Sequence, residues 1–164
     1  MQRRPLLFLL SALPAAALAR PARAQATEPT APQPELPKQR LVIVTRDGTR
    51  HDFTVEMATT PEQQQVGEMF RKTIPADTGM LFDWGMPRDS QMWMRNTLAP
   101  LDMVFINADG TIRSIAENTV PESLAVIDSH GPVRATLELA GGITARLNIR
   151  VGDKVLQAIF GNAG

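Results

Sequence analysis

Short apolar and alternating runs, separated by turn residues, make up most of the chain. Residues 41–44 are Leu-Val-Ile-Val, and residues 51–57 alternate polar and apolar side chains. Asp47 and Gly48 lie between the two runs. Two β-forming runs that flank an Asp-Gly pair predict a β-hairpin.

One helix is predicted after this hairpin. Thr60 suits the position that caps a helix, and Pro61 suits the first turn. Gln63 completes the spacing of a capping box. We expect the helix to end near Phe70.

The remaining pattern again indicates strands, with a loop containing Gly85 and Pro87 between the first two. A short helix is expected through Leu147, with Asn148 as a left-handed cap. The further strands are expected at residues 80–82, 91–94, 103–106, 111–117, 133–139 and 155–159. Because strands dominate without regular strand–helix alternation, we predict a mainly β (α+β) fold. It would be a single compact β-sandwich or barrel-like domain with one or two short helices.

The N-terminal part of the chain has a different composition. Residues 1–24 combine a basic start, an apolar stretch and a small-residue site ending at Ala24, as in a secretory signal peptide. The apolar stretch is too short for the alternative, a spanning helix. Residues 25–39 are predicted to be a Pro-rich disordered tether, and residues 40–160 a single globular β-rich domain. We therefore expect an exported protein of the bacterial periplasm, with no transmembrane anchor after cleavage; Sec and twin-arginine export both stay open.

Charge and cysteine content exclude several classes of function. Removal of residues 1–24 takes away four of the 17 basic residues and none of the 17 acidic ones, leaving a formal charge of −4. No basic stripe is present, so a nucleic-acid partner is not expected. The absence of cysteine excludes disulfides, thiolate catalysis and cysteine-ligated metal sites.

The segment Met92-Trp93-Met94 precedes an uninterrupted Arg-Asn-Thr. In a strand, Met92 and Met94 share one face and Trp93 lies on the other. Soft thioethers invite the hypothesis of a Cu(I) site. Packing in the core is the more usual role of methionine, and we favour it.

Arg95, Asn96 and Thr97 admit two interpretations. Their donors and acceptors could hold a carboxylate, a phosphate or a sugar. Alternatively, they could satisfy backbone groups, with Asp102 as a buried partner of Arg95 or Arg71. The residues themselves do not decide between ligand binding and structure.

Other polar groups point less clearly to a site. Residues 128–130 are Asp-Ser-His, but adjacent residues do not converge as a hydrolase triad does, so we interpret them as a loop. His51 and Asp52 would point to opposite faces of a strand, so we do not expect them to share a metal ion. Glu138 falls opposite the apolar face of its strand and could meet Arg71 or Arg95 across a cleft.

Several segments together resemble the domain of unknown function 192 family. They are Gly67 to Arg71, Gly79 to Phe82, Met92 to Thr97 through Leu101-Asp102, Leu137 to Leu139 with Gly142, and Gly152-Asp153. The resemblance covers about residues 40 to 160 and implies a compact, mainly β fold with one or two short helices, but no activity. Glu68 stands where the family usually has Leu, which suggests that this helix position is not fully buried. Arg95 stands where Lys is common, which keeps the charge and changes its geometry.

The leading functional hypothesis is a small periplasmic binding or accessory module with a cleft for a polar or anionic ligand. The residues expected to form this site are Arg71, Trp93, Arg95, Asn96, Thr97, Asp102 and Glu138. No cofactor and no metal are expected. The alternative is a hydrolase or lyase that uses Asp102 and Glu138 as a carboxylate pair. A third hypothesis makes the Arg-Asn-Thr motif a buried polar clamp with no ligand.

Overall fold

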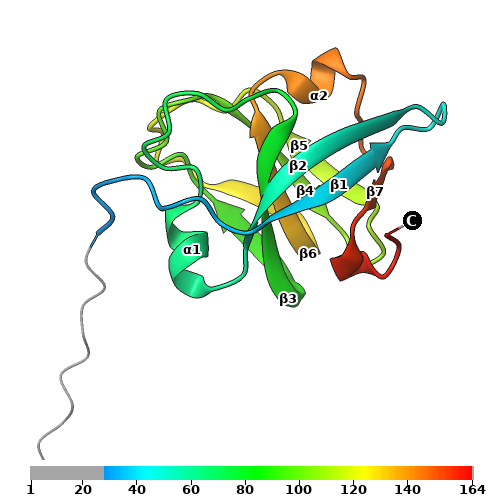
Figure 1. Cartoon of the computed structure of the whole chain (residues 1–164), viewed down its shortest axis with the longest axis horizontal. Coiled ribbons are helices and arrows are strands. Elements are labelled where there is room, and N and C mark those ends of the chain that lie inside the picture. Colours follow the sequence, from blue (N-terminus) through cyan, green and yellow to red (C-terminus); the bar gives the residue numbers. More distant parts are fainter. Residues whose placement is uncertain (1–27, 164) are drawn as a thin grey trace, which may run out of the picture.

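The computed structural model describes residues 28–163, so the expected signal peptide lies outside the described residues (Figure 1). Within this range the chain forms a single seven-stranded sheet with short helices, as expected for a mainly β domain. The elements are β1 (Lys38–Val44), β2 (Arg50–Ala58), α1 (Pro61–Val66), β3 (Thr78–Met92), β4 (Leu101–Ile106), β5 (Ile112–Ala116), β6 (Ile127–Ala140), α2 (Ile143–Arg146), β7 (Lys154–Leu156) and the 3-10 helix η1 (Ala158–Phe160).

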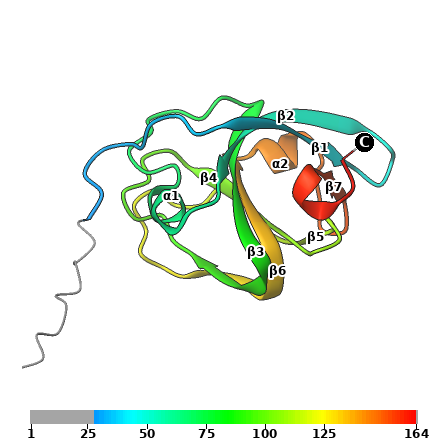
Figure 2. The same ribbon diagram turned by 60° about the horizontal axis from the view of Figure 1, so that its bottom comes forward.

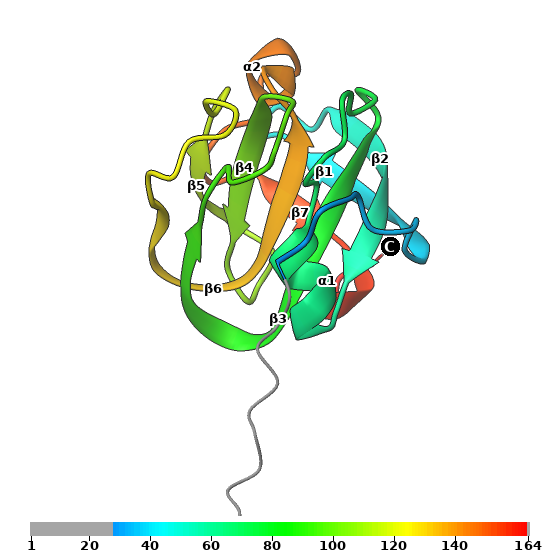
Figure 3. The same ribbon diagram turned by 90° about the vertical axis from the view of Figure 1, so that its left-hand side faces the viewer.

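The sheet has the order β5-β4-β6-β3-β2-β1-β7 and curls into a half-barrel (Figures 1 and 3). Neighbouring strands are antiparallel except β2 and β3, which are parallel and are joined through α1. A single bridge between Thr111 and Lys154 brings the two ends of the strand order together. The curl creates an inner and an outer face, which are filled differently.

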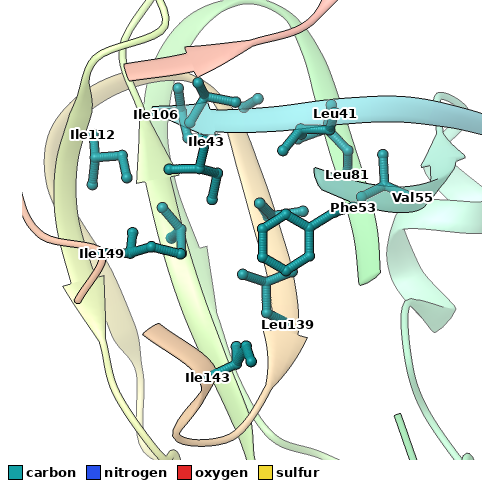
Figure 4. Packing of buried hydrophobic residues seen from close by; sticks show 14 of the residues in the cluster. Leu41, Ile43, Phe53, Val55, Leu81, Ile106, Ile112, Leu139, Ile143 and Ile149 are labelled. Carbon is teal, nitrogen blue, oxygen red and sulfur yellow. The ribbon is translucent and has the colours of Figure 1, made fainter. Parts of the chain in front are cut away.

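The inner face holds the larger hydrophobic core (Figure 4). Strand alternation supplies it, because residues two apart in β4 and β6 point to the same side. Val104 lies opposite Leu137 in the register of these strands, and both belong to this core. The other members include Leu41, Ile43, Phe53, Val55, Leu81, Ile106, Leu139, Ile143 and Val155.

The outer face carries two smaller clusters. Met80 and Phe82 of β3 form one with Ala58, and Met103 and Phe105 of β4 belong to the other. Figure 2 shows α1 on one side of the β3–β6 pair and α2 on the other. The outer face therefore lies beneath α1 and its neighbouring loops, and the candidate site is found there.

The first hairpin, the buried strand at 103–106 and the second hairpin are confirmed. So is the left-handed conformation of Asn148, whose φ is 57°. The capping box is also present, since Thr60 accepts from the amide of Gln63 and the Gln63 side chain accepts from the Thr60 amide.

Four expected boundaries were wrong. β3 is one strand of 15 residues, not two strands and a loop, because register shifts rather than a break accommodate Gly85 and Pro87. β6 begins at Ile127, so residues 128–130 lie in a strand. α1 ends at Val66, before Phe70, and the last strand ends at Leu156, so that Ile159 belongs to η1.

The described part of the expected tether follows the domain surface. The Gln33 side chain donates to the carbonyls of Gln63, at 3.2 Å, and Gly67, at 3.0 Å. The amide of Leu36 donates to Glu56 at 2.8 Å. From Gln33 onward the segment is therefore held against the domain rather than fully solvated. None of the helices in residues 28–163 has the length and apolar character needed to cross a bilayer.

Candidate functional site

A sharp turn after α1 directs Glu68 onto the outer face of the sheet. Gly67 ends the helix with φ 50° and ψ −133°, a backbone conformation that suits glycine. A Cβ atom at this position would lie 2.9 Å from the Phe82 ring and 3.3 Å from Glu138 Oε2. Phe70 also has a positive φ, and its amide donates to the Asn96 carbonyl at 2.8 Å. The turn thus brings the chain into close contact with β3 and β6.

Glu138 lies in a row of residues that crosses four strands of the same face. In register order the row is Glu56 of β2, Met80 of β3, Glu138 of β6 and Met103 of β4. Glu138 is 4% exposed, and its Oε2 atom is buried without a hydrogen-bond partner. A buried polar atom without a partner is uncommon and requires an explanation.

Arg71 is the cation of this cluster. Its guanidinium donates to both carboxylate oxygens of Glu56, at 2.7 and 2.9 Å, in a bidentate pair. Its Nη1 also forms an ion pair with Glu68 Oε2 at 3.0 Å, although neither Glu68 oxygen accepts a well-formed hydrogen bond. Arg71 therefore holds Glu56 more firmly than it holds Glu68.

These differences set the acidity of the three carboxyl groups. Burial raises the pKa of Glu56, but hydrogen bonds from Arg71 and the Leu36 amide outweigh it, so that pKa is lower than usual. Burial raises the pKa of Glu68 to about 7, against the opposing charge of Arg71. Burial, with the nearby charge of Glu68, raises the pKa of Glu138 to about 8, against the opposing effects of the Glu68 backbone amide and the Arg71 charge. Two of the three groups thus hold protons near neutral pH.

A cavity of about 350 Å³ opens beside the two protonated groups. It lies between α1, β3 and β6. Its walls combine carboxyl, amide, aromatic and thioether groups, among them Gln64, Glu68, Phe82, Trp84, Arg88, Gln91, Met92, Trp93, Thr97 and Glu138. A second cavity of about 280 Å³ is lined by Gln33, Glu56, Glu68 and Arg71, so Glu68 separates the two.

The structure divides the residues expected from the sequence. Trp93, Thr97 and Glu138 line the larger cavity, and Arg71 lines the smaller one. Trp93 is 46% exposed, so it forms part of the rim. The other three expected residues, Arg95, Asn96 and Asp102, line neither of these two cavities.

Most of the Arg-Asn-Thr motif makes structural contacts. Arg95 pairs with Glu28 and lies 5.6 Å from the centre of the Trp93 ring. Asn96 has a left-handed backbone, with φ 56°, and its carbonyl holds the turn after α1. The Thr97 hydroxyl donates to the Arg95 carbonyl, and the Thr97 carbonyl accepts from the Glu122 amide. These contacts fix one loop against another.

Asp102 is a buried structural acceptor rather than a partner of Glu138. It is 0% exposed and accepts from the amides of Asn118, Gly142 and Thr144 and from the Thr144 hydroxyl, at 2.7–2.8 Å. It lies opposite Leu139 in the β4–β6 register, whereas Glu138 lies opposite Met103. Asp102 and Glu138 therefore point to opposite faces of the sheet, which does not bring the carboxylate pair of the hydrolase hypothesis together.

Glu68 and Glu56 were missing from the expected site. The inference that Glu68 is not fully buried was wrong, because only 2% of it is exposed. One signal was available, since Glu68 is a single charge inside Val66-Gly67-Glu68-Met69-Phe70. For Glu56, alternation along β2 was the corresponding signal, because it separates Glu56 from Val55 and Met57 of the inner core.

The methionines of the central segment pack in the hydrophobic clusters. Met94 is fully buried, and its sulfur accepts from the Thr119 hydroxyl at 3.0 Å. Met92 packs beside it as a partly buried neighbour. In residues 28–163, no three His, Cys, Asp or Glu side chains are arranged to hold a metal ion.

Comparison with known proteins identifies the family. A protein of Sinorhizobium meliloti 1021, described as a "putative transcription regulator", has a crystal structure that matches with a TM-score of 0.75 and 47% identity, over 77% of this chain and 98% of that one. A protein of unknown function from Novosphingobium aromaticivorans DSM 12444 matches with a TM-score of 0.72 and 38% identity, over 83% of this chain and 94% of that one. No curated protein matches the chain. The model of the family DUF192, described as "Uncharacterized ACR", matches residues 42–157, and the chain therefore belongs to this family.

Proposed function

We propose that this protein is a small periplasmic binding or accessory module that takes a small polar ligand into the cavity between α1, β3 and β6. One observation carries the proposal: the Oε2 atom of Glu138 is buried beside this cavity without a hydrogen-bond partner. A ligand polar group would supply the missing partner. The volume of about 350 Å³ is within the range of small-molecule sites.

The composition of the wall supports a polar ligand with an apolar side. Trp84 and Trp93 offer flat apolar surface, while the amides of Gln64 and Gln91 offer donors and acceptors. Trp93 at the rim can be covered by a ligand without disturbing the core. Export rests on the N-terminal sequence pattern alone and is part of the proposal.

Other functions have weaker support. An anionic ligand would meet Glu68 and Glu138, and Arg95, expected to attract it, pairs with Glu28 instead. A hydrolase based on Asp102 and Glu138 lacks a shared cleft. Transcription regulation, suggested by the description of the Sinorhizobium protein, finds no support in a sequence with equal numbers of basic and acidic residues and no basic stripe.

A thermal-shift screen tests the proposal. Neutral sugars and amides, carboxylates and phosphates, and small amines would be added to the wild type and to Trp93→Ala, Glu138→Gln and Glu62→Gln. Glu62→Gln is the matched control, since Glu62 is exposed on α1 and does not line the cavity. At least one class should raise Tm in the wild type and the control, and raise it less in the other two variants. Equal shifts in all four proteins, or no shift with any class, would overturn the proposal.

A further inference from the structure

The outer-face cluster contains more acid than base. Glu56, Glu68 and Glu138 share one buried neighbourhood with a single guanidinium, that of Arg71. Lys38 acts on Glu56 only through its charge. If all three acids were ionised, negative charges would outnumber the buried positive one. Buried charges need partners, so the deficit must be met by protons or by an added cation.

Arg71 cannot meet this deficit. Its two terminal nitrogens donate to Glu56, and its single charge is shared between Glu56 and an ion pair with Glu68, while Glu138 Oε2 has no hydrogen-bond partner. Arg88 of β3 lines this cavity, but its guanidinium lies 4.1 Å from the centre of the Trp84 ring. When Glu68 and Glu138 are both ionised, the missing positive charge would therefore have to come from the cavity that they line.

The aromatic wall of the same cavity favours the same kind of ligand. Phe82 and Trp84 lie with ring centres 5.7 Å apart and both line the cavity, with Trp93 at the rim. Tryptophan faces attract cations, and positively charged ammonium groups are commonly recognised by such aromatic surfaces. In this protein an arginine already lies over each tryptophan.

We propose that the ligand of this cavity is an organic cation, a small molecule bearing a protonated amine or a quaternary ammonium group, which lies beside Glu68 and Glu138 and displaces a proton from them. The inference rests on the proposed function and specifies its ligand class. Two observations carry it. Buried oxygens of Glu68 and Glu138 accept no hydrogen bond beside the cavity, although one Glu68 oxygen is in an ion pair with Arg71, and aromatic side chains line the same cavity.

The exchange balances in charge and in protons. A carboxylic acid of the pair releases one proton to solvent and becomes a carboxylate, and the cation of the ligand takes the place of that proton. The charged groups that face the pair are Glu56 from β2, Arg71 from the turn after α1 and Arg88 from β3, and Glu35 and Lys38 line the second cavity together with Glu68. Because the pKa values of Glu68 and Glu138 are about 7 and about 8, binding must compete with protons at lower pH. Affinity should therefore increase from pH 6 to pH 8, by at most about tenfold per pH unit for each proton displaced.

Isothermal titration with matched probes tests this. Choline and ethanolamine carry the charge, and 3,3-dimethylbutan-1-ol and ethylene glycol are their neutral counterparts of similar shape. We expect at least one cation to bind the full mature protein at least tenfold more tightly than its neutral counterpart. Its affinity should increase with pH, and titrations in buffers of different ionisation enthalpy should show proton release.

Two variants localise the effect. Glu138→Gln and Glu68→Gln keep the shape of the protonated acids, so both are expected to fold; circular dichroism checks this. Each should weaken cation binding by more than tenfold and reduce proton release, whereas Glu62→Gln should not. Equal affinity for the charged and neutral probes, or cation binding without pH dependence in the wild type, would overturn the inference whatever the variants do. If neutral polar probes bind and cations do not, the inference fails and the proposed function stands; if nothing binds, both fail.

Discussion

Asp102 and Glu138 are buried carboxyl groups on neighbouring strands, and their surroundings are opposite. Asp102 faces the inner side of the sheet, where four donors surround its two oxygens. Glu138 faces the outer side, where one oxygen has no donor and a cavity adjoins it. Asp102 lies opposite Leu139, which is the residue next to Glu138 in β6.

The comparison shows that burial alone does not distinguish a carboxyl group whose hydrogen bonds are complete from one whose hydrogen bonds are not. A fully hydrogen-bonded carboxylate holds its neighbours in place and leaves nothing for a ligand to satisfy. An unsatisfied carboxyl group destabilises the free protein unless it is protonated, and it gains most from a ligand. Asp102 belongs to the first kind and Glu138 to the second.

The largest expected effect comes from Asp102→Asn. The amide presents an NH₂ group to donors that previously met an oxygen, so buried N–H groups of Gly142 or Thr144 lose their acceptor. We expect a loss on the order of 3 kcal/mol in the free energy of unfolding, measured by urea denaturation.

Glu138→Gln is the matched change for this experiment. It also converts a buried acid to its amide, but it removes no hydrogen bond from Oε2. At pH 8 it should leave stability unchanged or increase it. A loss as large as that of Asp102→Asn would contradict the distinction between the two acids.

The pattern of apolar positions was enough to predict the strands that form this contrast. The buried run at 103–106 and the alternation at 133–139 placed Glu138 opposite the apolar face, as observed. The donors around Asp102 could not be predicted, because three of the four are backbone amides, from the loop after β5 and from the start of α2, rather than Arg71 or Arg95. A charged residue in the sequence suggests a charged side-chain partner. A backbone amide is present at almost every residue, so the sequence does not indicate which amide will be the donor.

Glu68 shows a different limit. We placed it in a helix that continued to Phe70 and expected that its position would not be fully buried. The helix ends at Val66 because Gly67 adopts a conformation that suits glycine, and the next residue is then directed inward. Two hydrogen bonds from Gln33, a residue assigned to a tether, support this turn. Local propensity did not show that the turn at Gly67 would direct Glu68 inward, because its contacts come from residues distant in sequence.

The pH dependence of stability tests the same contrast on the outer face. The folded-state pKa values of Glu68 and Glu138, about 7 and about 8, exceed the ordinary value of 4.5. Between these values the folded protein holds protons that the unfolded chain has lost, so stability must fall as pH increases from about 5 to 8. Above about 8 the decrease from these two groups should level off.

Urea unfolding at several pH values between 5 and 9 measures this slope. Glu138→Gln should make it shallower, and Glu68→Gln combined with Glu138→Gln should remove most of it. Asp102→Asn, which changes neither of these two groups, should lower the whole curve. If the wild type instead becomes more stable from pH 5 to 8, the two groups are not protonated in the folded protein.

The smallest expected effect concerns the segment that contacts the turn before Glu68. Gln33→Ala removes two hydrogen bonds to carbonyls at the end of α1, and we expect a loss of about 1 kcal/mol. Glu28→Ala, which removes only an exposed partner of Arg95, should change little and serves as the control. If Gln33→Ala also flattens the pH dependence, the segment helps to keep Glu68 buried. A uniform loss at every pH would show that the turn keeps Glu68 buried without help from this segment. The contrast between the two faces would then depend on β3, β6 and Gly67 alone.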